Sequence, residues 1–160
     1  MPHELTVQTL YNCTNGDEVA PMPETVYREV LCSMITIFVV DDQDSTRTGL
    51  RLRIGLEDDL TIVGEAGDAD AALAQVALLR PDVVVMDVAM PGVDGISATT
   101  ELLVRMPEVA VVMLSLHDDQ LTREAAADAG AVAFVGKQEP DDKLLAALRR
   151  AGGRRTGEQL

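Results

Sequence analysis

The sequence predicts an α/β protein with a doubly wound parallel sheet of five strands and five helices. From Met34 onward, short β-branched runs alternate with segments of helical periodicity, and the runs are apolar throughout rather than at every second residue. Strands that are apolar on both faces are typical of parallel sheets covered by helices on both sides. The length of 160 residues and the 47 % hydrophobic content support one domain with a full core.

The expected elements follow one another in strict alternation. The strands are expected at 35–40, 60–65, 82–86, 109–114 and 131–135, and the helices near 45–56, 68–79, 95–105, 119–129 and 141–151. Typical capping residues mark the helix ends: Asp44 or Ser45, Asp68, Asp94 and Asp118 at the starts, and Gly130 and Gly152 at the ends.

The flanks of this pattern differ from its centre. Residues 1–33 are expected to form a poorly ordered extension with one short helix near 24–31, residues 34–152 the domain, and residues 153–160 a tail or the start of a linker. A misassigned start codon is an alternative explanation of the extension. Cys13 and Cys32 have no histidine cluster near them, so free thiols in a reducing cytosol are expected.

The net charge of −14 argues against binding of this chain to nucleic acid or anionic lipid. The apolar runs are far shorter than the roughly 18 residues of a membrane-spanning helix, and no signal peptide is recognisable, so we expect a cytoplasmic protein. Four arginines near the end, Arg149, Arg150, Arg154 and Arg155, are expected to cap the last helix and begin a linker rather than to form a DNA-binding arm.

Polar side chains follow four of the five expected strands. Asp41 and Asp42 follow the first strand, Asp87 the third, Ser115 the fourth, and Lys137 the fifth, after one glycine. Each of these residues taken alone is explained as a turn, cap or solvated residue. Because the carboxyl ends of parallel strands meet at one edge, their joint placement predicts a site there.

Charge repulsion indicates what such a site would bind. Two carboxylates about 4 Å apart repel each other by about 4 kcal/mol at an effective dielectric constant near 20. Either some of the carboxyl groups keep a proton or a cation lies among them, and Mg²⁺ suits carboxylate oxygens with open positions. Lys137 suits a phosphoryl group, Ser115 offers a hydroxyl donor, and an aspartate so placed can form an aspartyl phosphate.

These residues lie in segments that resemble the response-regulator receiver domains of bacterial two-component signalling over about residues 34–152. The resemblance is carried by PDVVVMDVAMPGVDG (81–95), VVDDQDSTRTGL (39–50), VVMLS (111–115) and AGAVAFVGK (129–137). The segments GEAGDADAAL (64–73) and KQEPDDKLLAAL (137–148) are similar to the NarL/FixJ group. The resemblance implies a flavodoxin/CheY-like sheet with strand order 2-1-3-4-5.

The resemblance also implies roles for the acidic residues. Asp87 would accept the phosphoryl group. Asp42, Asp87 and the main-chain carbonyl of Ala89 would bind Mg²⁺ directly, and Asp41 would also act on the metal, either at close range or, as the favoured alternative, through water. Lys137 would pair with Asp87 and then with the phosphoryl group.

A switch is implied as well. The Ser115 hydroxyl would move toward the phosphoryl oxygens, and Phe134, three residues before Lys137, would turn inward and change the surface of the fourth helix, fifth strand and fifth helix. An ordinary core aromatic is the alternative reading of Phe134.

The sequence departs from the family at two positions. Gln138 follows Lys137 where many receivers have proline, so a cis-prolyl turn is not carried over. Leu116 is bulkier than the alanine or glycine often found there, which predicts slower access of phosphodonor or water to Asp87. His117 and Ala89 are expected to tune the dephosphorylation rate, and a phosphorelay role for His117 is a further alternative.

The leading functional prediction is a receiver that takes a phosphoryl group from a sensor histidine kinase, catalyses only its own phosphotransfer and dephosphorylation, and forms a homodimer on phosphorylation. Alternatives are the receiver part of a truncated NarL/FixJ-type DNA-binding transcriptional regulator, since no helix-turn-helix domain fits before Leu160, and an interaction module that works without phosphorylation. An aspartyl phosphatase would carry Asp-x-Asp after the first strand. A flavodoxin would have an uncharged phosphate loop where this chain has DDQDSTRTG.

Overall fold

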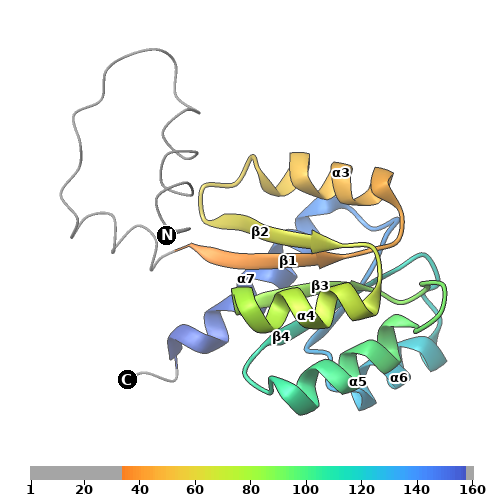
Figure 1. Ribbon diagram of the computed structural model, residues 1–160. Coiled ribbons are helices and arrows are strands. Elements are labelled where there is room, and N and C mark those ends of the chain that lie inside the picture. The colour runs from red at the N-terminus through yellow and green to blue at the C-terminus, as the bar shows by residue number, and fades with distance from the viewer. Residues whose placement is uncertain (1–33, 158–160) are drawn as a thin grey trace, which may run out of the picture. The chain divides into compact units, whose positions relative to one another are not determined.

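The computed structural model describes residues 34–157, with side chains through residue 154, and has the five-stranded parallel sheet that the sequence predicts (Figure 1). The strands lie in the order β2-β1-β3-β4-β5, which confirms the strand order implied by the resemblance. The elements are β1 (Ile35–Val40), α3 (Asp44–Ile54), β2 (Leu60–Ala66), α4 (Ala69–Leu79), β3 (Val83–Asp87), α5 (Gly95–Arg105), β4 (Ala110–Ser115), α6 (Gln120–Asp128), β5 (Ala133–Gly136) and α7 (Asp141–Gly157).

Helices cover both faces of the sheet, as apolar strands require. Successive strand side chains point to opposite faces, so Phe38 and Val40 pack under α4, α5 and α6, while Ile37 and Val39 pack under α3 and α7 (Figure 1). All four are fully buried. The strands that carry the polar residues at their ends are therefore packed between two layers of helices.

Four strands, β2 to β5, end one residue later than the sequence predicts. β3 ends at Asp87 and β4 at Ser115, so both polar residues belong to the strands rather than to the loops after them. The cause is that the parallel pairing continues, with Asp87 opposite Leu114 and Ser115 opposite Gly136. Both side chains are buried, and they start from backbone that the sheet fixes.

The helix caps agree with the prediction at two of four starts. Asp68 accepts a hydrogen bond from the Ala71 N–H, and Asp94 accepts from Ile96 and Ser97. The predicted cap Asp118 is wrong by one residue: Asp119 accepts from the Thr122 N–H and caps α6. At α3 the residue before the helix is Gln43, which makes no side-chain cap bond, and Asp44 lies in the first turn.

Gly130 follows α6 with φ +102°, as the prediction of a helix end requires. Gly152, predicted as a helix end, lies instead inside α7, which continues to Gly157. A Cβ at position 152 would lie 2.5 Å from Cγ2 of Ile35. This glycine therefore allows α7 to approach β1 closely.

Arg149 also lies within α7 rather than at its end. Its guanidinium hydrogen-bonds Glu57 and Asp59 in the α3–β2 loop, with nitrogen–oxygen distances of 2.7 Å to each residue. These hydrogen bonds hold the pKa of both carboxyl groups below the usual range. Arg149 thus ties α7 to the amino edge of the sheet, and its predicted role as a helix cap is wrong.

Some predictions lie outside the described residues: the extension 1–33, its helix near 24–31, Cys13, Cys32 and the side chain of Arg155. Within residues 34–157, no helix has the length and apolar character needed to cross a membrane.

The two adjacent glycines of α7 provide a stability test. Gly152→Ala is expected to destabilise the protein by about 1–2 kcal/mol, because the new methyl group overlaps Ile35. Gly153→Ala, whose Cβ would meet no atom within 4 Å, should stabilise it by about 0.5–1 kcal/mol through helix propensity. Urea unfolding measures both changes. Equal effects of the two substitutions would show that Ile35 does not constrain position 152.

Candidate functional site

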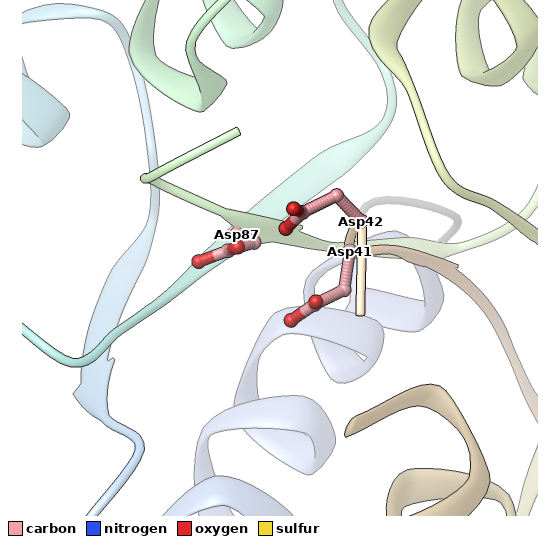
Figure 2. A group of neighbouring side chains, drawn as sticks. All are labelled: Asp41, Asp42 and Asp87. Carbon is pink, nitrogen blue, oxygen red and sulfur yellow. The ribbon is translucent and has the colours of Figure 1, made fainter. Parts of the chain in front are cut away.

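Three carboxylates converge at the carboxyl edge of the sheet (Figure 2). Asp41 and Asp42 follow β1, Asp87 ends the neighbouring strand β3, and each offers a carboxylate oxygen within 4.8 Å of the other two. Asp41 and Asp87 are 1 % and 3 % exposed, whereas Asp42 is open to solvent. The sequence-based expectation that these residues meet at one edge is confirmed.

Lys137 is the cation of this cluster. Its Nζ lies 2.7 Å from Oδ2 of Asp41 and 3.2 Å from Oδ1 of Asp87, and its side chain is 10 % exposed. The sequence interpretation paired Lys137 with Asp87 alone, but the shorter contact is to Asp41. The lysine therefore bridges the two buried carboxylates and offsets part of their repulsion.

The pKa shifts of Asp87 and Lys137 indicate that this compensation is incomplete. Burial raises the pKa of Asp87, and the charge of Asp41 raises it further, against the opposing effect of Lys137. Burial also works to lower the pKa of Lys137, but the hydrogen bond that Lys137 donates to Asp41 and the charge of Asp87 outweigh it and leave that pKa raised. The lysine is thus held protonated, and the fully ionised site carries more negative than positive charge.

This donor set fits a magnesium ion. Carboxylate oxygens are hard ligands, Mg²⁺ needs only one or two of them together with water, and Asp42 faces solvent. A divalent cation would also offset the charge that Lys137 leaves uncompensated. Asp42 and Asp87 are the residues best placed to bind it directly, since both oxygens of Asp41 already accept hydrogen bonds, from Gln43 N–H at 2.8 Å and from Lys137.

The backbone around Asp87 is folded tightly against the strand end. Gly95 begins α5, and its N–H donates to the carbonyl of Val88 at 2.9 Å. A Cβ at Gly95 would lie 1.9 Å from the carbonyl oxygen of Asp87, so only glycine fits there. The Ala89 N–H lies 3.4 Å from Oδ1 of Asp87, which places exposed Ala89 beside the acceptor carboxylate.

Ser115 ends β4, the strand next to Asp87 in the sheet, and Phe134 lies on β5, one strand further out. Ser115 is fully buried, and its Oγ accepts a hydrogen bond of 3.0 Å from the His117 N–H. The Lys137 N–H donates to the Ser115 carbonyl at 2.7 Å, so the hydroxyl and the lysine belong to adjacent backbone segments. Phe134 is half-buried and packs at the edge of the core under α4, α5 and α6.

Arg123 is a residue that the sequence interpretation missed. Its guanidinium lies 4.7 Å from the centre of the Phe134 ring, forms an ion pair with Asp118, and lies 3.6 Å from Glu139. It thus touches the loop after Ser115, the aromatic ring of β5 and the loop after Lys137. The sequence around Arg123 does not predict these contacts, because all of them arise from tertiary packing.

Comparisons with known proteins agree with this geometry. Residues 37–149 match the sequence pattern of the response regulator receiver domain. The transcriptional regulatory protein DegU of Brevibacillus brevis is 33 % identical over 115 residues, which are 72 % of this chain and 49 % of DegU. The DNA-binding transcriptional activator DevR/DosR of Mycobacterium tuberculosis is 36 % identical over 123 residues, 77 % of this chain and 57 % of that protein.

A solved structure gives the same picture of the fold. The crystal structure of a LuxR-family two-component response regulator from Aurantimonas sp. SI85-9A1 superposes with a TM-score of 0.73 and 30 % identity, covering 76 % of this chain and 86 % of that one. The chain spans about half the length of the curated relatives it matches, 49 % of DegU and 57 % of DevR/DosR.

Asp87→Asn tests the charge imbalance directly. Because the pKa of Asp87 is raised on folding, the ionised carboxylate costs stability above the ordinary aspartate pKa, and that cost disappears as the pH falls below it. At pH 7 without divalent cations, the substitution should stabilise the protein by about 1 kcal/mol in urea unfolding. The gain should shrink toward pH 3.

Asp94→Asn is the matched control, since hydrogen bonds from the Ser97 and Ile96 N–H groups lower the pKa of Asp94. It should give no stabilisation. If Asp87→Asn destabilises the protein at pH 7, the claim that the ionised site carries uncompensated negative charge is contradicted.

Proposed function

The chain belongs to the response regulator receiver domain family, and on this premise we propose that Asp87 accepts a phosphoryl group from a sensor histidine kinase in a Mg²⁺-dependent reaction. The observation that carries the proposal is the pairing of a buried Asp87 with Lys137, beside the carboxylates of Asp41 and Asp42. A turn or cap aspartate would not need a buried lysine and two acidic neighbours.

The metal would be held by Asp42, Asp87 and the main-chain carbonyl of Ala89, with Asp41 acting through water. The full use of both Asp41 oxygens by Gln43 and Lys137 supports that indirect role. Bound Mg²⁺ would supply positive charge that neutralises phosphoryl oxygens beside Asp87.

The transfer itself would use the Asp87 carboxylate as the nucleophile. A carboxylate oxygen attacks phosphorus, the nitrogen–phosphorus bond of the kinase phosphohistidine breaks, and the imidazole leaves with the bonding electron pair. Lys137 would exchange part of its contact with Asp87 for a contact with the transferred phosphoryl oxygens. The Ser115 hydroxyl now accepts a hydrogen bond from the His117 N–H. It would turn away from that N–H and donate to another of the phosphoryl oxygens.

The output would be a changed surface on α6, β5 and α7. Phosphorylation adds acceptor oxygens next to Ser115 and Lys137, and a local charge event of this kind biases a two-state element. Phe134 would turn inward as Ser115 moves, and the altered surface would support a homodimer. We place this reaction in the cytoplasm and assign no membrane or nucleic-acid contact to the described domain.

A second candidate is favoured by the lengths of the relatives. DevR/DosR is named a DNA-binding transcriptional activator, and this chain spans 57 % of it. These residues would then be the receiver part of a DNA-binding transcriptional regulator, with the same phosphorylation chemistry and a different output.

Mass spectrometry after incubation with acetyl phosphate and Mg²⁺ tests the proposal. Wild-type protein should gain the mass of one phosphoryl group, and chelation of the metal should abolish the gain. Asp87→Asn should not be modified, since an amide is a poor nucleophile. Asp94→Asn changes an exposed helix cap by the same chemistry and should be modified like wild type. Unmodified wild-type protein, or a modified Asp87→Asn protein, would refute the assignment.

Leu116→Ala tests the access route to Asp87. Leu116 is 54 % exposed and lines a cavity of about 460 Å³ together with Gln43 and Lys137. Removing its side chain should speed loss of the phosphoryl group by about threefold or more, which corresponds to roughly 0.7 kcal/mol in the barrier. Leu121→Ala, at an exposed leucine of α6 outside that cavity, should leave the rate unchanged. Equal dephosphorylation rates of wild type and Leu116→Ala would contradict the idea.

A further inference from the structure

Arg47 is a largely buried arginine that lies against the backbone of the site. It belongs to the first turns of α3, and its side chain is 14 % exposed. Its Nη1 donates to the main-chain carbonyl of Asp41 at 2.5 Å, and its Nη2 pairs with Asp44. Its Nε lies 3.6 Å from Oε1 of Glu65 on β2. One guanidinium thus links α3, the end of β1 and β2.

The contact with the Asp41 carbonyl matters because of what that carbonyl belongs to. It is part of the peptide unit that joins Asp41 to Asp42, so the hydrogen bond fixes the backbone from which both acidic side chains start. The N–H of Asp41 is fixed independently by the carbonyl of Ala66 at 3.1 Å. The turn after β1 is therefore held at its amino end by β2 and at the following peptide by Arg47.

The guanidinium also packs beside a glycine at van der Waals distance. A Cβ at Gly67, just after β2, would lie 3.4 Å from Nη1 of Arg47 and 4.0 Å from the Asp41 carbonyl oxygen. A planar guanidinium with five N–H donors suits this position, since Nη1 reaches the Asp41 carbonyl while Nη2 reaches the Asp44 carboxylate. A lysine ammonium would keep the charge but could not span the same partners.

We infer that Arg47 is a positioning residue for the magnesium site, which holds the Asp41–Asp42 peptide so that the carboxylates face Asp87 before the cation binds. This inference rests on the proposed function. Groups that orient metal ligands from outside the coordination sphere commonly change metal affinity by about 10- to 100-fold. Loss of Arg47 should therefore weaken Mg²⁺ binding while leaving the phosphoryl-accepting carboxylate intact.

The chain supplies a matched control one turn further along α3. Arg51 lies 3.2 Å from Oε2 of the same Glu65 and is 53 % exposed, and its Nη2 donates to the Thr48 hydroxyl rather than to the turn after β1. Arg51→Met removes the same charge from the same helix and breaks a pair with the same glutamate. An effect that Arg47→Met has and Arg51→Met lacks belongs to the contacts that Arg47 alone makes, which are the hydrogen bond to the Asp41 carbonyl and the pair with the exposed Asp44.

The experiment is a Mg²⁺ titration of the full chain, followed by amide NMR, on wild type, Arg47→Met, Arg47→Lys and Arg51→Met. Arg47→Met should raise the Mg²⁺ dissociation constant by about tenfold, Arg47→Lys should weaken binding by less, and Arg51→Met should stay within about twofold of wild type. The Mg²⁺ concentration for half-maximal phosphorylation by acetyl phosphate should rise in parallel. The rate at saturating Mg²⁺ should recover, which a general loss of folding would not allow.

The outcomes separate the inference from the function on which it rests. Equal Mg²⁺ affinities of Arg47→Met and Arg51→Met, with wild type binding normally, would overturn the role of Arg47 alone. Wild-type protein that neither binds Mg²⁺ nor accepts a phosphoryl group would overturn the proposed function and the inference together. If Arg47→Met does not fold, Arg47→Lys decides: wild-type affinity in that variant would refute the need for the guanidinium fork.

Discussion

The repulsion between the buried carboxylates of Asp41 and Asp87 is the interaction on which the rest of the site depends. Lys137 bridges the two groups and offsets part of that repulsion, yet the pKa of Asp87 stays raised. A third carboxylate, Asp42, adds to the imbalance from the solvent side. A cation would offset this excess of negative charge, and under the proposed function an anion would then share the cation and the lysine. Magnesium and a phosphoryl group meet both conditions.

The scaffold divides stability and chemistry between opposite edges of the sheet. At the amino edge, Arg149 ties α7 to the α3–β2 loop, and Gly152 lets α7 close on Ile35. At the carboxyl edge, strand pairing continues through Asp87 and Ser115, and the backbone is fixed by close approaches such as that of Gly95. Charged groups that repel one another can be held together there because the strands beneath them are buried on both faces.

The strands, the helices and the acidic cluster could be predicted from the sequence, because each corresponds to a pattern of neighbouring residues. An apolar run that stops at a polar residue shows where a strand ends, and parallel strands bring such ends together. Arg47 and Arg123 were not predictable in this way, since their partners lie on other elements. Gly152 was misread because a glycine that ends a helix and one that admits a neighbouring strand look alike in sequence. At Asp118 and Asp119, either residue could serve as the cap.

The most direct test of the central claim is a crystal structure of the full chain grown with Mn²⁺ and beryllofluoride. The account predicts one Mn²⁺ ion, located by its anomalous scattering peak, that is bound by carboxylate oxygens of Asp42 and Asp87. It also predicts beryllofluoride on the Asp87 carboxylate, with Lys137 and the Ser115 hydroxyl turned toward its fluorine atoms. An anomalous peak elsewhere, or an unmodified Asp87 still paired with Lys137 at saturating ligand, would contradict the account.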